Sequence, residues 1–235
     1  MKAHTEKCRL NLPDEKIWSA TYRTSTIDVL QYGKHYASYD LLPEPYCLKC
    51  AYPSGICMNC SDLYGFNRVY ALGVYHKGLP HPQLTSHILD MKQDKEMAEP
   101  LTSALECSIK NRYPELTDTE IIIPVPNHKD KVKNKGFNQA SVLSDQLGSK
   151  MKIKSADILI KIRESSQTGA SREQRRINAE GAYLLDSFRA KEIRDKKIIV
   201  LDDVFTTGFT LSECSKVLLD GGAREVNCVV LGRTD

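Results

Sequence analysis

Two adjacent carboxylates, Asp202 and Asp203, follow a run of four apolar residues and precede a turn rich in threonine and glycine. The run Ile198–Leu201 predicts a buried strand, and the residues from about Thr210 predict a helix. Backbone N–H groups at a helix N-terminus have no partner within the helix and attract phosphate. We name residues 206–210 the phosphate loop, because its glycine permits a close backbone approach and its threonines add hydroxyl donors. Its members are Thr206, Thr207, Gly208, Phe209 and Thr210.

The acidic pair, Asp202 and Asp203, needs partners that the end of a strand does not supply. Ionised carboxylates in a partly buried place are costly unless they accept hydrogen bonds or face a cation. Two ribose hydroxyls with Mg²⁺ nearby would satisfy both groups. The alternative is a helix N-cap with solvent-facing acids, which is common. Such caps do not usually follow a continuous apolar strand with paired acids, so we expect a ribose-phosphate site here.

Four of the eight cysteines form two C-x-x-C pairs joined by residues 51–56. Four thiolates at this spacing can complete a tetrahedral Zn²⁺ site, which is structural because no position stays open for substrate. An iron–sulfur cluster, a redox pair and reduced thiols are the alternatives. The other cysteines are scattered, so their placement argues against a disulfide framework. The expected zinc ligands are Cys47, Cys50, Cys57 and Cys60.

A polar and basic segment that contains glycine, residues 163–178, lies between two predicted strands. Such a segment can be mobile and can close over a pyrophosphate, although a solvated run of charge is the usual meaning of this composition. We expect Arg163 and Arg175 to stabilise negative charge on a leaving group. Four lysines that follow the Pro-Val-Pro run could contact pyrophosphate as a group: Lys129, Lys131, Lys133 and Lys135.

Short apolar strands alternate with helices over most of the chain. This pattern predicts an α/β fold with a parallel sheet covered on both faces, with ligands beyond the carboxyl ends of the strands. Strands are expected at 68–75, 120–123, 157–162, 197–201 and 225–231, and helices within 83–110 and at 138–147 and 210–219. Residues 1–46 show no sustained periodicity of apolar residues. We expect three parts: an unassigned N-terminal extension (1–46), a cysteine module (47–65) and the α/β domain (66–235).

Segment 198–210 resembles, at every position, the ribose-phosphate signature of type I phosphoribosyltransferases. Residues 123–128 and 135–139, residues 163–183 and the cysteines upstream are similar to the ComF family, which is associated with bacterial competence for DNA uptake. The resemblance covers residues 47–235. The family usually has Arg before the Gly-Phe-Asn-Gln run. This chain has Lys135 there, which keeps the positive charge but cannot form the paired hydrogen bonds of a guanidinium.

The resemblance implies a type I phosphoribosyltransferase-like sheet flanked by helices, with a small N-terminal zinc-ribbon-like module. It implies that Asp202 and Asp203 contact ribose hydroxyls, and that the phosphate loop holds the 5′-phosphate of phosphoribosyl pyrophosphate. The implied reaction transfers the phosphoribosyl group to an unidentified nitrogen acceptor, with Mg²⁺, and releases pyrophosphate. The alternatives are a non-catalytic regulator that binds phosphoribosyl pyrophosphate or a nucleotide, and a DNA-uptake accessory protein with single-stranded DNA or a competence protein as partner.

Composition and charge are those of an ordinary globular protein. Lysine and arginine number 33 against 30 acidic residues, so the formal charge is +3, which suits an anionic ligand but does not by itself indicate nucleic acid or a membrane. No run approaches the roughly 18 apolar residues of a membrane helix, and the first residues lack the apolar core of a secretory signal. We therefore expect a cytoplasmic protein without membrane insertion.

Overall fold

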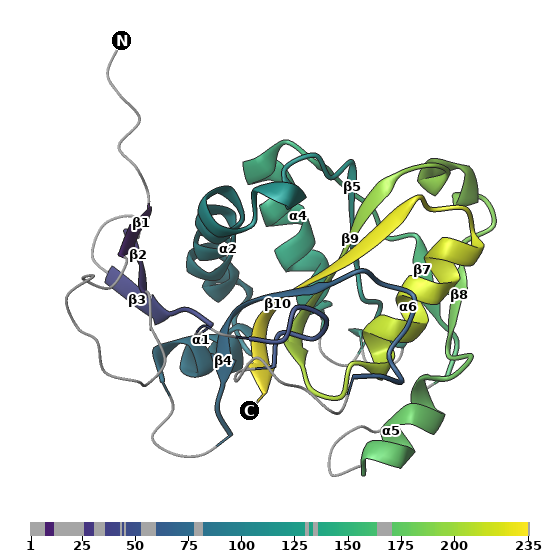
Figure 1. Ribbon diagram of the computed structural model, residues 1–235, viewed down its shortest axis with the longest axis horizontal. Coiled ribbons are helices and arrows are strands. Elements are labelled where there is room, and N and C mark those ends of the chain that lie inside the picture. Colours follow the sequence, from purple (N-terminus) through teal and green to yellow (C-terminus); the bar gives the residue numbers. More distant parts are fainter. Residues whose placement is uncertain are drawn as a thin grey trace.

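A five-stranded parallel sheet with helices on both faces forms the centre of the molecule (Figure 1). The strand order is β4-β10-β9-β5-β6, and every neighbouring pair is parallel. The expected α/β class with a covered parallel sheet is therefore confirmed. The structure is a computed structural model that describes residues 8–11, 26–30, 36–42, 44, 46–52, 60–77, 82–129, 132–133, 136–163 and 171–234.

Four of the five strands start close to their predicted positions, and two of these run several residues further, whereas the short edge strand β6 was not predicted. The predicted strand 197–201 continues through the acidic pair to Phe205, and the last strand extends to Thr234. Because Val230 pairs with Asp202 and Arg233 with Phe205, β10 accompanies β9 up to the phosphate loop. The bounds are β4 Val69–Tyr75, β5 Ile121–Pro124, β6 Lys154–Ser155, β9 Lys197–Phe205 and β10 Glu225–Thr234.

The helices agree with the apolar periodicity and begin at recognisable residues. The helical region 83–110 is interrupted before Ala98, and Pro100 lies in the first turn of the second helix, where its missing N–H costs nothing. The Asn138 side chain caps the next helix by accepting a hydrogen bond from the Ala140 N–H. The α-helices are α1 Gln83–Met91, α2 Ala98–Arg112, α4 Gln139–Met151, α5 Arg172–Ala179 and α6 Phe209–Asp220, and short 3₁₀ turns occupy Lys95–Met97, Pro114–Leu116 and Ala190–Ile193.

Alternate side chains of the central strand point to opposite faces, which divides the core in two. Ile199 and Leu201 of β9 pack with the apolar residues of α1, α2 and α4. Ile198 and Val200 pack on the other face with α6 and with the cysteine module. Figure 1 shows α2 and α4 on one side of the sheet and α6 on the other. The cysteine module is thus part of the core that lies beneath α6.

Two expectations about residues 157–178 are wrong. The strand predicted at 157–162 is β7 Leu159–Lys161, and it forms a separate antiparallel pair with β8 Tyr183–Leu185 instead of joining the parallel sheet. The segment 163–178, expected as a polar loop, is helical from Arg172. The helix α5 begins there because Ser171 caps it, accepting from the Gln174 N–H. Residues 164–170 lie outside the described part of the chain.

The N-terminal extension, for which no fold was assigned, contains a three-stranded antiparallel sheet of order β1-β2-β3. Its strands are β1 Cys8–Asn11, β2 Thr26–Leu30 and β3 Tyr36–Asp40. The strands β1 and β2 lie beside α2 (Figure 1), whereas β3 contacts α1 and β4. One scattered cysteine, Cys107 of α2, is disulfide-bonded, so the argument against disulfides does not hold at this position. Among the described residues, no helix has the length and apolar character needed to cross a membrane.

We expect Ile199→Ala to lower the free energy of unfolding by about 2–5 kcal/mol, because it removes buried methyl groups from the middle of the central strand. Denaturant unfolding measures the loss. The control is Ile177→Ala on α5, where the side chain is exposed and the change should be about 0.5 kcal/mol or less. Equal effects of the two substitutions would contradict the position of β9 at the core.

Candidate functional site

The phosphate loop is the sharp connection between β9 and α6. Gly208 adopts a φ of 84°, a left-handed conformation that disfavours other residues. A Cβ atom there would lie 2.4 Å from the Phe205 ring and 2.8 Å from Leu63, so only glycine fits. The first amides of α6 have no partner within the helix and point toward an incoming anion. The hollow at this turn is lined by Arg175, Asp202, Val204, Phe205, Thr206, Thr207, Gly208, Thr210 and Leu211.

The acidic pair lies at the carboxyl end of β9, directly before this hollow. The Asp203 N–H donates to Asp202 Oδ1 at 2.9 Å, and the Val204 N–H donates to Asp203 Oδ1 at 2.7 Å. Loss of solvent and the adjacent Asp203 carboxylate raise the pKa of Asp202 well above its usual range. This pair therefore stores unfavourable electrostatic energy that ribose hydroxyls or a cation would relieve.

One of the two predicted arginines reaches the hollow and the other does not. Arg175 of α5 donates from Nη1 to the Thr206 hydroxyl at 3.1 Å, which places a cation beside the phosphate loop. Arg163 is exposed and outside the lining, and its guanidinium lies against Gly181. The predicted residues Lys135 and Cys57 lie outside the described part of the chain.

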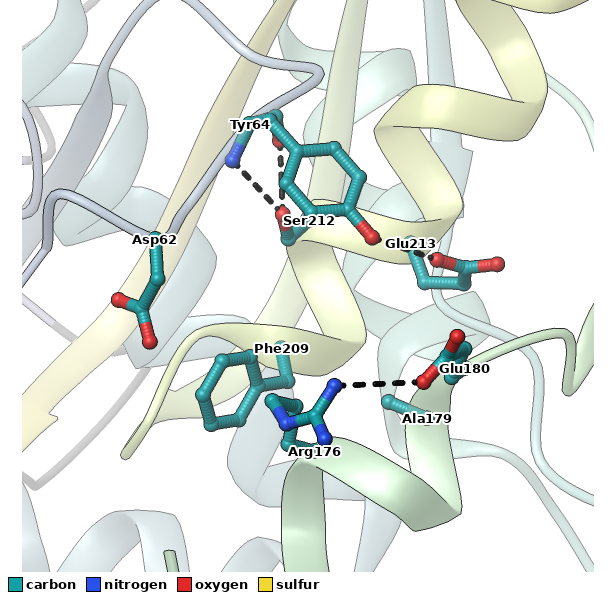
Figure 2. Close-up of a pocket in the computed structure, with 8 residues that line it drawn as sticks. All are labelled: Asp62, Tyr64, Arg176, Ala179, Glu180, Phe209, Ser212 and Glu213. Carbon is teal, nitrogen blue, oxygen red and sulfur yellow. Dashed lines mark hydrogen bonds and ion pairs between the residues drawn. The ribbon is translucent and has the colours of Figure 1, made fainter. Parts of the chain in front are cut away.

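Phe209 belongs to the predicted phosphate loop, but its side chain turns away from the hollow. The ring is buried and lines a second cavity between the cysteine module, α5 and α6 (Figure 2). Only its backbone can therefore contribute to anion binding at the helix N-terminus. The lining of the second cavity is Asp62, Tyr64, Arg176, Ala179, Glu180, Phe209, Ser212 and Glu213.

Polar contacts across this cavity fasten the end of the cysteine module to α6. The Tyr64 N–H donates to Ser212 Oγ at 2.9 Å, and the Ser212 hydroxyl donates to the Tyr64 carbonyl at 2.8 Å (Figure 2). The Tyr64 hydroxyl donates to the Glu213 carboxylate at 3.2 Å. Asp62 forms an ion pair with Arg172 of α5. The module thus contacts both helices that carry the site.

Three cysteine thiols converge as a metal site requires. The Sγ atoms of Cys47, Cys50 and Cys60 lie within 4.8 Å of one another, and the Cys47 and Cys60 sulfurs are 3.9 Å apart. Zinc–sulfur bonds of about 2.3 Å in a tetrahedron separate the sulfurs by about 3.8 Å. Burial raises the pKa of Cys47, but hydrogen bonds from the backbone of Cys50 and Lys49 and from the neighbouring thiols lower it overall. The three described thiols therefore lie close enough to bind a metal ion, at separations that fit zinc.

Two cations beside the site were not anticipated from the sequence. Lys92, which follows α1, has its Nζ atom 3.5 Å from Asp203 Oδ2. No local pattern pointed to this lysine, because the sheet brings it to the acidic pair from a distant part of the chain. Arg233 is buried near the end of β10 and contacts the backbone of the phosphate loop. Arg233 follows the apolar residues of the last strand, and this position of a charged residue is the sequence feature from which its role could have been predicted.

Comparison with known proteins finds one matching domain family and several similar proteins. The model of the phosphoribosyl transferase domain matches residues 132–233. A Haemophilus influenzae protein named Competence protein F is 30% identical over 199 residues, which cover 80% of this chain and 85% of the relative. An Escherichia coli O157:H7 protein named DNA utilization protein YhgH is 28% identical over 159 residues. This match covers 66% of this chain and 68% of the relative. A solved structure described as the allosteric regulatory enzyme of purine biosynthesis has a TM-score of 0.38 at 16% identity, covering 57% of this chain and 25% of that one.

We expect the free energy of unfolding of the Asp202→Asn variant to increase relative to that of the wild type as the pH rises from about 4. The folded-state pKa of Asp202 is raised, so the unfolded chain releases this proton at a lower pH and the wild type loses stability as the pH increases. Asparagine does not titrate and keeps an oxygen for the Asp203 N–H. Urea unfolding at a series of pH values measures the difference.

The matched control is Asp220→Asn, at an exposed carboxylate at the end of α6. This position lacks both the burial and the adjacent carboxylate that act on Asp202. If the advantage of Asp202→Asn stayed constant or shrank with rising pH, the electrostatic description of the acidic pair would be wrong.

We expect the purified chain to contain about one zinc ion, and Cys60→Ser to remove most of it. Cys228→Ser is the control, because this buried cysteine lies beside Ser215 and is not one of the three converging thiols. Elemental analysis measures the metal. Iron in place of zinc, or no metal in the wild type, would refute the assignment.

Proposed function

Because the chain belongs to the ComF family of phosphoribosyltransferase-like proteins, we propose that it binds phosphoribosyl pyrophosphate and transfers the phosphoribosyl group to a nitrogen acceptor. The observation that carries this proposal is the acidic pair followed directly by the phosphate loop at the carboxyl edge of the sheet. Ligands of parallel α/β sheets bind at this edge. The acceptor is a small molecule with a nucleophilic nitrogen.

The phosphate loop would hold the 5′-phosphate. The amides at the start of α6, the hydroxyls of Thr206, Thr207 and Thr210, and the helix dipole all favour a dianion. Arg175 supports this role, since it already donates to Thr206. Its position suits the 5′-phosphate better than the leaving pyrophosphate, which is a change from the role expected from the sequence.

The acidic pair would hold the two ribose hydroxyls. Each hydroxyl can donate to a carboxylate, which favours the ionised form of Asp202 despite the burial that raises its pKa. Lys92 lies beside Asp203, and its charge also favours the ionised form of Asp202. Mg²⁺, when bound with the substrate, would supply positive charge at the pyrophosphate.

The proposed reaction exchanges one bond for another at the anomeric carbon. The bond from C1 to the pyrophosphate oxygen breaks, and pyrophosphate leaves with the electron pair. The acceptor nitrogen forms the new bond to C1 and releases its proton to solvent. Positive side chains would stabilise the leaving group; Lys135 is a candidate, and Arg163 would have to move toward the hollow to contribute.

A second candidate function is handling of single-stranded DNA, and the names of the relatives favour it. One relative is named a competence protein and another a DNA utilization protein. A nucleic-acid role predicts binding whose logarithmic affinity falls linearly with the logarithm of the salt concentration. Fluorescence anisotropy with a single-stranded oligonucleotide at several salt concentrations measures this dependence, and binding that salt leaves unchanged would argue against the role.

We expect the double variant Asp202→Asn with Asp203→Asn to lose at least about 100-fold in affinity for phosphoribosyl pyrophosphate with Mg²⁺, since each hydrogen bond to a charged group contributes about 1.5–3 kcal/mol. Isothermal titration calorimetry measures the affinity, and circular dichroism checks the fold. Asp220→Asn is the control with the same chemical change on the surface. Unchanged affinity in the double variant would refute the assignment of the acidic pair.

The same titration separates an enzyme from a sensor when pyrophosphate release is followed with a panel of nucleobases. Release that depends on an acceptor supports the transferase. Binding without release across the panel supports a regulator that senses phosphoribosyl pyrophosphate. Absence of binding by the wild type would overturn the proposal.

A further inference from the structure

Arg233 connects the cysteine module to the phosphate loop through the interior of the protein. Its side chain is 7% exposed. The Nε atom donates to the carbonyl of Cys50 at 3.1 Å, and Nη1 donates to the carbonyl of Thr206 at 3.2 Å. Nη1 also donates to the Thr234 carbonyl and hydroxyl. One guanidinium therefore bridges a metal-ligand turn and the first residue of the phosphate loop.

Two aromatic rings hold the guanidinium in this orientation. Its central carbon lies 5.3 Å from the ring centroid of Tyr52 in the cysteine module and 4.7 Å from that of Phe205 at the end of β9. Both distances are within the range of a cation–π interaction, which is stronger away from water. The ring of Phe205 also lies directly beneath Gly208. The two rings and the guanidinium thus form a continuous set of contacts from the cysteine module to the turn at Gly208.

The cysteine module contacts the phosphate loop a second time, from the side of α6. Leu63, whose N–H donates to the carbonyl of Cys60 at 3.1 Å, has a methyl carbon only 2.8 Å from the position that a Cβ on Gly208 would take. Tyr64 exchanges two hydrogen bonds with Ser212, in the first turn of α6 (Figure 2). Displacement of the turns at Cys50 and Cys60 would therefore alter the support of the loop on both sides.

We infer that Arg233 is a positioning residue that makes the geometry of the phosphate loop depend on the cysteine module and on the metal its thiols fit. The module folds around its metal because its own apolar content is small. Metal binding orders the turn at Cys50, and Arg233 transmits that order to the Thr206 carbonyl. The inference about ligand affinity rests on the proposed function, whereas the link itself does not.

The first test uses ¹⁵N relaxation of the full chain and needs no ligand. In the zinc-loaded wild type, the amide order parameters of Thr206, Thr207 and Gly208 are expected to be about 0.85, and to fall below about 0.6 after zinc is removed with a chelator. Zinc-loaded Arg233→Met is expected to show the same loss while it retains its zinc. The amide of Val200, in the middle of β9, should stay rigid in all samples.

Arg224→Met is the matched control, because Arg224 is exposed and lies before the opposite end of β10. It should leave the order parameters of the loop unchanged. Arg233→Lys is a second variant: lysine keeps the charge and the buried stem but has a single ammonium in place of the planar fork. It should bind zinc normally and still lose order in the loop.

The second test measures linkage with ribose 5-phosphate as the probe. In the wild type, removal of zinc should weaken binding about tenfold, within the usual range of coupling between two sites. Zinc-loaded Arg233→Met should bind as weakly as the zinc-free wild type, and its affinity should not change further when zinc is removed. A residue that merely stabilised the fold would lower affinity without abolishing this dependence on zinc.

The two tests distinguish failure of the link from failure of the proposed function. Loop order parameters that are unchanged by chelation in the wild type, or unchanged by Arg233→Met, overturn the link whatever the ligand data show. Loss of order in the loop together with no binding of ribose 5-phosphate by the zinc-loaded wild type supports the link and refutes the proposed function.

Discussion

The close approach of backbone at Gly208 is the constraint on which the candidate site depends. The chain must leave the central strand, turn within three residues and start a helix whose first amides point into solvent. A φ of 84° and contacts with Phe205 and Leu63 leave no room for a side chain there. This turn is held from below by the aromatic ring of its own strand and from the side by the cysteine module. The position of β9 between β10 and β5 then determines where the turn lies.

The acidic pair adds an electrostatic requirement to this geometric one. Burial beside a second carboxylate raises the pKa of Asp202, so its ionised form is disfavoured unless hydrogen-bond donors or a cation face it. Lys92 partly balances the acids, and Arg175 adds positive charge beside the amide-lined turn; the two come from different helical regions. Opposite charges therefore lie side by side at the carboxyl edge of the sheet. A ligand with hydroxyls and a phosphate matches both kinds of group.

The cysteine module belongs to the same core as α6. Cys50, Ala51, Leu63 and Phe66 are buried with the face of the sheet that α6 covers. A compact module with little apolar surface can occupy such a place when a metal orders it. Its contacts with α6, α5 and Arg233 connect the converging thiols to the turn between β9 and α6.

The amino-acid sequence determined those features that depend on neighbours along the chain: the strand before the acidic pair, the helix after Gly208, the cysteine spacing and the parallel class of the sheet. Local hydrogen bonding and apolar periodicity encode them. Tertiary structure decided which groups meet. It brought Lys92 to Asp203, set Arg175 against Thr206 and left Arg163 outside the hollow. It also placed Arg233 between Cys50 and Thr206, because strand order and register bring together residues that no sequence spacing relates.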